Sequence, residues 1–312
     1  MLSKYVYKLL LSQVLLMKNL RILFFAVALF GLGAAAQVTT TTSALPEVYL
    51  VGTAHDGHFW PEAHYSINDL RKEIESLHPQ VICGEIAPES YKTPFEGYYP
   101  PEAAYLDEIA PSLNARFVAS DWRIASGWQG RAQETMPKAL REEWEASEAE
   151  IGKQLKEALK SETVFDFLHG DFVTLSRHKF EDVLGENTVG DIALGGWHER
   201  NRRIVENCLD GAAGAHRVVI AFGASHIEQL QPQVERRGAT VKIAPRLFTP
   251  SGMGTVPGAV VARWQLNHDH LTAILAGKIQ VSADALSKLN DSNRVQELER
   301  ALKVYGAEPA KP

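Results

Sequence analysis

Two stretches of the chain decide the fold, EVYLVGTAH (47–55) and HRVVIAFGASH (216–226). Each is an apolar, β-branched run that ends in Gly, two small residues and His. Short apolar runs bounded by Gly indicate buried strands. A third Gly-x-x-His, GGWH (195–198), has no apolar run before it, so the context and not the spacing carries the signal. The Gly is expected to let the chain turn sharply where each strand ends.

The residues around these runs predict an alternation of strands and helices. SINDLRKEIESLHP (66–79) has a capping pattern and one apolar face, and PQVICGEI (79–86) is typical of the next strand. Further strands are expected at 114–123 and 239–245, and a helix at 196–211. Strand–helix–strand units pair in parallel. We therefore predict an α/β fold, with a mostly parallel sheet, flanking helices and two strand–GxxH–helix halves.

The N-terminus has the pattern of an export signal. MKNLRILFFAVALFGLGAAAQ (17–37) runs from two cations through an apolar segment to Ala34-x-Ala36. We predict a signal peptide over 1–36, with Met17 as an alternative start, and a secreted or periplasmic protein. An uncleaved membrane anchor is the alternative, which the short apolar core disfavours.

The remaining chain is predicted to form one domain. A Thr-rich linker spans 37–46, the domain spans 47–305, and a loose tail spans 306–312. Strand signals vanish between about 124 and 195, which predicts a helical insertion that could act as a lid. Nothing from 246 to 312 is long and apolar enough for a membrane span.

Charge and cysteine content exclude some classes of partner. The chain has 32 Lys and Arg against 38 Asp and Glu, a net charge of −6. Removal of 1–36, which holds four of the cations, changes this to −10. Such an acidic protein has no electrostatic footprint for nucleic acid and is repelled by anionic membranes. Export permits a disulfide between Cys83 and Cys208, but two buried free thiols are the preferred interpretation.

One titratable residue follows each of the first four predicted strands. These residues are His55, Glu85, Asp121 and His226. In an open parallel sheet, ligands bind outside the carboxyl ends of the strands. Two imidazoles with one or two carboxylates suit Zn, Mn or Fe. For a single strand-end His, a loop or cap role is the simpler interpretation, but two in matching contexts favour a site.

Other residues are candidates for substrate contacts. On the helix 196–211, Asn201 shares a face with apolar residues and so needs a partner. Arg200, Arg202 and Arg203 stand around it, and one arginine that reaches over the strand ends could stabilise a carbonyl oxyanion. His58 and Trp60, in the loop after GTAH, could line a substrate pocket, although aromatic packing of a surface loop explains them equally well.

These motifs together resemble the TraB/PrgY/GumN–TIKI superfamily, which is distantly related to the erythromycin esterase and ChaN-like proteins. The resemblance covers about 47–245, apart from the insertion, and rests on GTAH, Glu85, ERNRR (199–203) and GASH. It implies an active-site set of His55, Glu85, Arg200 and His226. It also implies a metal-dependent hydrolase with Mn or Co, whereas the esterase relatives use His and Glu without a metal and ChaN is linked to haem iron.

Three functions therefore stay open for this site. The first is an exported hydrolase of amide, peptide or ester bonds, in which His55, His226, Glu85 and Asp121 hold Mn, Co or Zn, or Glu85 is the base. The second is a metal-independent, esterase-like hydrolase in which one His is the general base. The third is a non-enzymatic protein that binds haem, a metal or a peptide. We expect a small-molecule or peptide substrate for the first two.

Overall fold

A five-stranded, all-parallel sheet forms the centre of the computed structural model, which describes residues 45–160 and 163–306. The strand order is β3-β2-β4-β1-β5. Helices flank this parallel sheet, so the predicted α/β fold is confirmed. The strands are β1 (Glu47–Thr53), β2 (Val81–Gly84), β3 (Arg116–Ala119), β4 (Arg217–Gly223) and β5 (Thr240–Ile243).

Strands β1 and β4 are neighbours near the middle of the sheet. Their register pairs Gly52 with Phe222 and Thr53 with Gly223. From β1 the chain crosses to β2, and from β4 it crosses the other way to β5. Ligands of open α/β sheets bind where the strand order reverses in this way. The two GxxH motifs therefore meet at that point.

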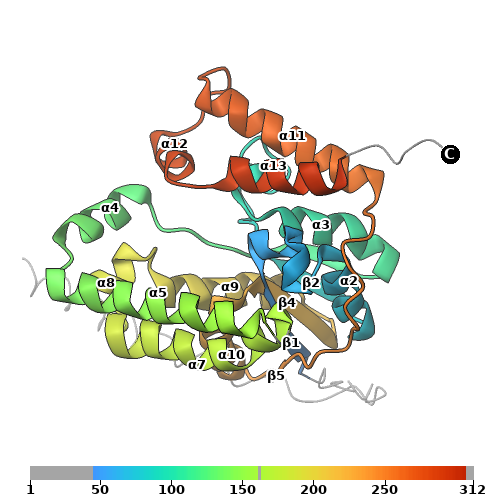
Figure 1. Cartoon of the computed structure of the whole chain (residues 1–312), viewed down its shortest axis with the longest axis horizontal. Coiled ribbons are helices and arrows are strands. Elements are labelled where there is room, and N and C mark those ends of the chain that lie inside the picture. Colours follow the sequence, from blue (N-terminus) through green and yellow to red (C-terminus); the bar gives the residue numbers. More distant parts are fainter. Residues whose placement is uncertain (1–44, 161–162, 307–312) are drawn as a thin grey trace, which may run out of the picture. The chain divides into compact units, whose positions relative to one another are not determined.

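Helices cover both faces of the sheet. Figure 1 shows α2 (Ile67–Ser76) and α3 (Pro101–Ile109) on one side, and α9 (Trp197–Gly211) and α10 (Ile227–Arg236) on the other. A capping box between Ser66 and Asp69 begins α2, as the sequence predicts. The crossovers from β1 to β2 and β3 run toward one edge of the sheet, and those from β3 to β4 and β5 run toward the other edge. Because these crossovers are right-handed, the reversal places α2 and α3 on one face and α9 and α10 on the opposite face.

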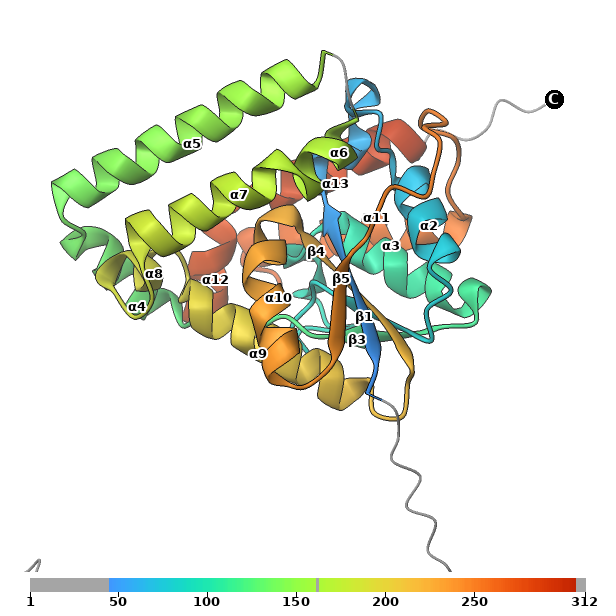
Figure 2. The same cartoon turned by 90° about the horizontal axis from the view of Figure 1, so that it is seen from below.

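The segment between β3 and α9 is helical, as predicted. Figure 2 shows α5 running alongside α6 and α7. Helix α6 is attached to the sheet because the backbone N–H of Gly52 donates to His169 Nε2 at 2.9 Å. The helices are α4 (Ser126–Thr135), α5 (Lys138–Ala158), α6 (Val164–His169), α7 (Asp171–Arg177) and α8 (Val189–Ala193).

The C-terminal part adds three helices, of which α11 and α13 pack on α3, as Figure 1 shows, while α12 packs on α11 and α4. They are α11 (Gly258–Leu275), α12 (Ala283–Asn290) and α13 (Arg294–Tyr305). The extended chain before α11 is held to α2 because Asp69 accepts hydrogen bonds from Ser251 N and Oγ. Buried residues of α11 and α13 belong to the same apolar core as the strands.

The preference for two free thiols is wrong, because Cys83 and Cys208 form a disulfide. Cys83 lies in β2 and Cys208 in α9, both fully buried. Their Cα atoms are 5.6 Å apart, within the range that a disulfide spans. Strand and helix positions were expected correctly, but the sequence did not show that this helix packs on this strand.

Two other expectations concern the ends of the chain and membranes. The predicted signal peptide over 1–36 and most of the linker lie outside the described residues. The tail 306–312 does so too, apart from Gly306. Along 45–160 and 163–306, no helix combines the length and the apolar character that a bilayer crossing requires.

Candidate functional site

The glycine of each GxxH motif is needed because the other motif lies against it. A Cβ on Gly52 would stand 2.8 Å from Ala224 Cβ, and a Cβ on Gly223 would stand 2.4 Å from His55 Nε2. Neither glycine has a positive φ. The two glycines are therefore needed for the close packing of β1 against β4 and not for the sharp turn that we expected. The two motifs contact each other where these strands end.

Two carboxylates and two guanidinium groups form the floor of the site. Arg200 donates from Nε and Nη2 to Asp121, and from Nη2 to Glu85 Oε1 at 2.9 Å. Arg123 donates to the same two carboxylates, to Asp121 Oδ2 at 2.7 Å and to Glu85 Oε1 at 3.1 Å. The other Glu85 oxygen, Oε2, accepts from Gly223 N at 3.0 Å. Both Nη1 atoms lack a hydrogen-bond partner among the described residues, so they can donate to a substrate.

His55 is held by a carboxylate from the opposite side. Its Nδ1 lies 2.6 Å from Glu102 Oε1, and its Nε2 lies 3.8 Å from Glu85 Oε2. Thr53 Oγ1 also donates to Glu102 Oε1. The His55 backbone has φ 47°, a left-handed conformation that costs about 1–3 kcal/mol for a non-glycine residue. Its side chain is 33% exposed, while Nε2 lies against Gly223 at the end of β4.

His226 is buried and held in one tautomer. Its Nδ1 lies 2.6 Å from Asn201 Oδ1, and Asn201 Nδ2 donates to the Trp197 carbonyl. The amide is thereby fixed with its oxygen toward the ring, so Nδ1 carries the proton and Nε2 is an acceptor. The ring stacks on Trp197 at 4.2 Å between centroids. Asn201 thus has the partner that its buried position requires.

Burial and charge set the two imidazoles apart. Burial lowers the pKa of His55, but the charges of Glu102 and Glu85 outweigh it and raise that pKa above 6.5. Burial and the charge of Arg200 hold the pKa of His226 well below 6.5. Burial alone would raise the pKa of Glu85, yet His55 and Arg200 hold it well below 4.5. The site therefore favours the protonated form of His55 and the neutral form of His226.

The donor set does not fit the expected metal. In the described part of the chain no three His, Cys, Asp or Glu side chains are placed to hold an ion. Both oxygens of Asp121 already accept from arginines, and so does Glu85 Oε1. A divalent cation would stand beside two guanidinium charges and would have to displace these bonds. Metal binding by His55, His226, Glu85 and Asp121 stays a prediction that this arrangement does not favour.

The two candidates from the loop after GTAH lie differently. His58 is fully buried, and both ring nitrogens contact backbone: Nδ1 lies 2.9 Å from the Tyr65 carbonyl and Nε2 accepts from Ala54 N. Burial lowers its pKa, which suits this neutral, structural position. Trp60 is exposed, and the guanidinium of Arg300 lies over its ring. Of these two residues only Trp60 is exposed, and substrate contact by Trp60 stays a prediction.

Two residues of the site escaped the sequence predictions. Glu102 lies in the first turn of α3, a helix that was not expected between β2 and β3. Pro101 at its first position is a signal that could have revealed that helix. Arg123 follows Asp121 by two residues in DWR, but only the fold shows that it reaches Glu85.

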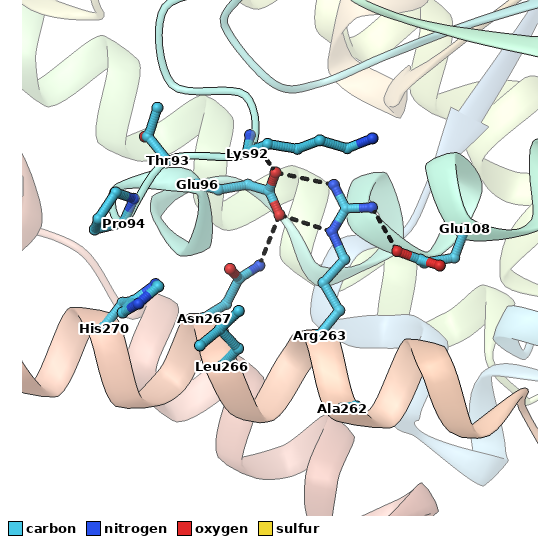
Figure 3. Close-up of a pocket in the computed structure, with 10 residues that line it drawn as sticks. All are labelled: Lys92, Thr93, Pro94, Glu96, Glu108, Ala262, Arg263, Leu266, Asn267 and His270. Carbon is cyan, nitrogen blue, oxygen red and sulfur yellow. Dashed lines mark hydrogen bonds and ion pairs between the residues drawn. The ribbon is translucent and has the colours of Figure 1, made fainter.

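A separate pocket of about 400 Å³ lies between α11 and the loop before α3 and contains none of the candidate residues. Figure 3 shows Arg263 and Asn267 of α11 pointing at Glu96. The Arg263 guanidinium pairs with both Glu96 oxygens, at 2.8 and 2.9 Å, and also with Asp107 and Glu108. Since Glu96 and Arg263 satisfy each other, this ion-pair cluster holds α11 in place.

We compared the chain with protein-family models, with curated proteins and with solved structures, and none of the three comparisons gave a match.

Proposed function

We propose that the protein is a hydrolase of ester or amide bonds that uses His55 as general base and acid, without a metal ion. The observation that carries this proposal is the His55–Glu102 pair, with Nδ1 held at 2.6 Å and the side chain 33% exposed, next to a Glu85 carboxylate that binds two arginines. A carboxylate that holds one imidazole nitrogen leaves the other as a base of defined direction. The resemblance to the TraB/GumN group and its esterase relatives agrees with hydrolysis but remains a prediction.

The reaction needs one water and no further reactant. Neutral His55 takes a proton from water through Nε2, and the oxygen attacks the carbonyl carbon of the substrate. The carbonyl oxygen becomes negative and accepts hydrogen bonds from Nη1 of Arg123 and Arg200. His55 then returns its proton to the leaving oxygen or nitrogen as the bond to carbon breaks. His226 Nε2 offers a neutral acceptor that orients the water or a substrate hydroxyl.

The carboxylates have supporting roles in this mechanism. Glu85 and Asp121 hold both guanidinium groups in place, and Glu85 is a weak base because its pKa lies well below 4.5 under the charges of His55 and Arg200, although burial opposes this. Glu102 orients His55 and stabilises the imidazolium. A metal ion held by Glu85 and Asp121, as the metal-dependent hydrolase requires, would compete with these ion pairs for the carboxylate oxygens.

The test is hydrolysis of p-nitrophenyl acetate and of a quenched peptide mixture in the presence of EDTA. We expect His55→Ala to lower kcat/KM by about 100-fold or more, because general base catalysis contributes 10²–10⁴. Glu102→Gln removes the charge that raises the pKa of His55, so the acid limb of the pH profile should move to lower pH. The plateau rate should also fall, because the ring loses its charged partner.

His216→Ala is the matched control, since His216 is exposed before β4. It should leave kcat/KM unchanged. Activity that disappears in EDTA and returns with Mn²⁺ would replace this proposal by the metal-dependent hydrolase. Absence of turnover on every substrate would favour the binding protein.

A further inference from the structure

A pocket of about 330 Å³ opens between α4 and α12, next to the candidate site. We call it the α4–α12 pocket. Tyr98 connects the two, because it lines the pocket and its ring centroid lies 5.8 Å from Arg123 Cζ. Ser126, three residues after Arg123, lines the pocket as well. A substrate whose carbonyl reaches Arg123 would extend its remaining part past Tyr98 into this space.

The pocket wall offers several hydrogen-bond acceptors. Gln129 and Gln133 donate their amide groups to the Ala193 carbonyl, which turns their side-chain oxygens away from that bond. Within 45–160 and 163–306 no donor reaches these two oxygens or the Asp291 carboxylate. The Ser287 hydroxyl adds a group that can accept or donate. A ligand that satisfies this wall must bring several donors.

The charges of the lining residues also restrict which ligands the pocket can bind. Lys288 is the only cation among the lining residues, and it is paired with Asp284 at 2.8 Å. Asp291 is exposed and has no cationic partner in the described residues. The wall therefore carries no free positive charge for a phosphate or carboxylate. The ring of Tyr98 supplies one apolar face beside these polar groups.

We propose that the α4–α12 pocket binds a neutral, hydroxyl-rich part of the substrate, such as a sugar ring, whose hydroxyls donate to Gln129, Gln133 and Asp291. This inference rests on the proposed hydrolase function for the position of the scissile bond. The reaction would then be hydrolysis of an acyl group carried by a sugar or a similar polyol.

The test measures binding without turnover. Saturation-transfer NMR on the purified protein would use the methyl glycosides of glucose, galactose and N-acetylglucosamine, with N-acetyl-dialanine amide and glucuronate for comparison. We expect at least one methyl glycoside to bind more tightly than the peptide amide and the acid. Gln129→Leu with Gln133→Leu should weaken that binding by about fivefold or more, because each lost hydrogen bond removes a modest increment.

Gln265→Leu is the control, because it makes the same Gln-to-Leu change outside the pocket. Gln265 is an exposed residue of α11, and its amide donates to Asp269 of the same helix. It should leave the Kd of the glycoside unchanged. If the double variant does not fold, Ser287→Ala takes its place with the same expected direction. Failure of every glycoside to bind, tighter binding of the peptide amide, or equal binding by the double variant would overturn the inference.

The two proposals fail separately. Glycoside binding with no hydrolysis of acetylated glycosides contradicts the hydrolase and leaves the pocket assignment intact. Hydrolysis of p-nitrophenyl acetate that depends on His55, with no glycoside binding, contradicts the pocket assignment and leaves the hydrolase intact.

Discussion

His55 lies in a space that leaves almost no freedom to its ring. Glu102 holds Nδ1, and the Cα of Gly223 lies against the Nε2 side. The backbone at φ 47° adds a fixed direction to the side chain. Because interiors are packed to near-crystalline density, a single methyl group in such a place displaces the ring. The position of the base therefore depends on a glycine from the other motif.

Replacing Gly223 by Ala should separate catalysis from folding. The new Cβ would meet His55 Nε2 at 2.4 Å, so the ring must move, and the Ala backbone itself is unstrained because φ is −44°. A displacement of about 1 Å costs about 100-fold in rate. We expect kcat/KM for p-nitrophenyl acetate to fall by that factor, while the urea midpoint changes little.

Gly152→Ala serves as the control for this substitution. Gly152 lies in α5 with open space at its Cβ, and Ala there should stabilise the helix by up to about 1 kcal/mol without affecting kcat/KM. Unchanged activity in Gly223→Ala would show that the close contact of the two motifs does not position the base.

At the scale of elements, local patterns predicted strands well and contacts between elements poorly. The apolar runs of β1 and β4 and the capping box of α2 are local, so the sequence contains them. The contact of α3 with His55 and the pairing of β2 with α9 depend on crossovers that no short pattern encodes. Hence His55, Glu85, Arg200 and His226 were predicted as site residues, whereas Glu102, Arg123 and the disulfide were not.

The disulfide joins the strand and the helix that carry the floor of the site. Cys83 precedes Glu85 by two residues in the chain, and Cys208 lies on the same helix as Arg200. The bond closes a loop of 125 residues, and loops near that length give about 4–5 kcal/mol in the chain-entropy account. We expect Cys83→Ala with Cys208→Ala to lose about that free energy of unfolding in urea.

Reductant supplies the control for the disulfide variant. It should lower the urea midpoint of the wild-type protein toward that of the double variant and leave the variant itself unchanged. Equal midpoints for oxidised wild type and variant would mean that the two thiols are not joined in solution.

At the scale of the whole molecule, the C-terminal helices belong to the body that carries the site. Trp264 of α11 is fully buried, and its indole N–H donates to the Pro101 carbonyl at the start of α3. Its ring meets Phe59, in the turn after GTAH, edge-on at 5.7 Å between centroids. Glu102 follows Pro101 directly. One side chain thus links α11 to the helix and the turn that hold the proposed base.

Trp264→Ala should therefore weaken fold and activity together. Removal of a fully buried indole costs about 3–5 kcal/mol. Because α11 shares one core with the strands, unfolding followed by circular dichroism and by loss of hydrolysis should give the same urea midpoint.

Leu266→Ala, on the exposed side of the same helix, is the control and should change the free energy of unfolding by less than about 1 kcal/mol. If activity persisted after an early transition in circular dichroism, α11–α13 would unfold separately, and Trp264 would not support Glu102. Coincident transitions would instead mean that α11–α13 unfold together with the strands that carry the proposed base.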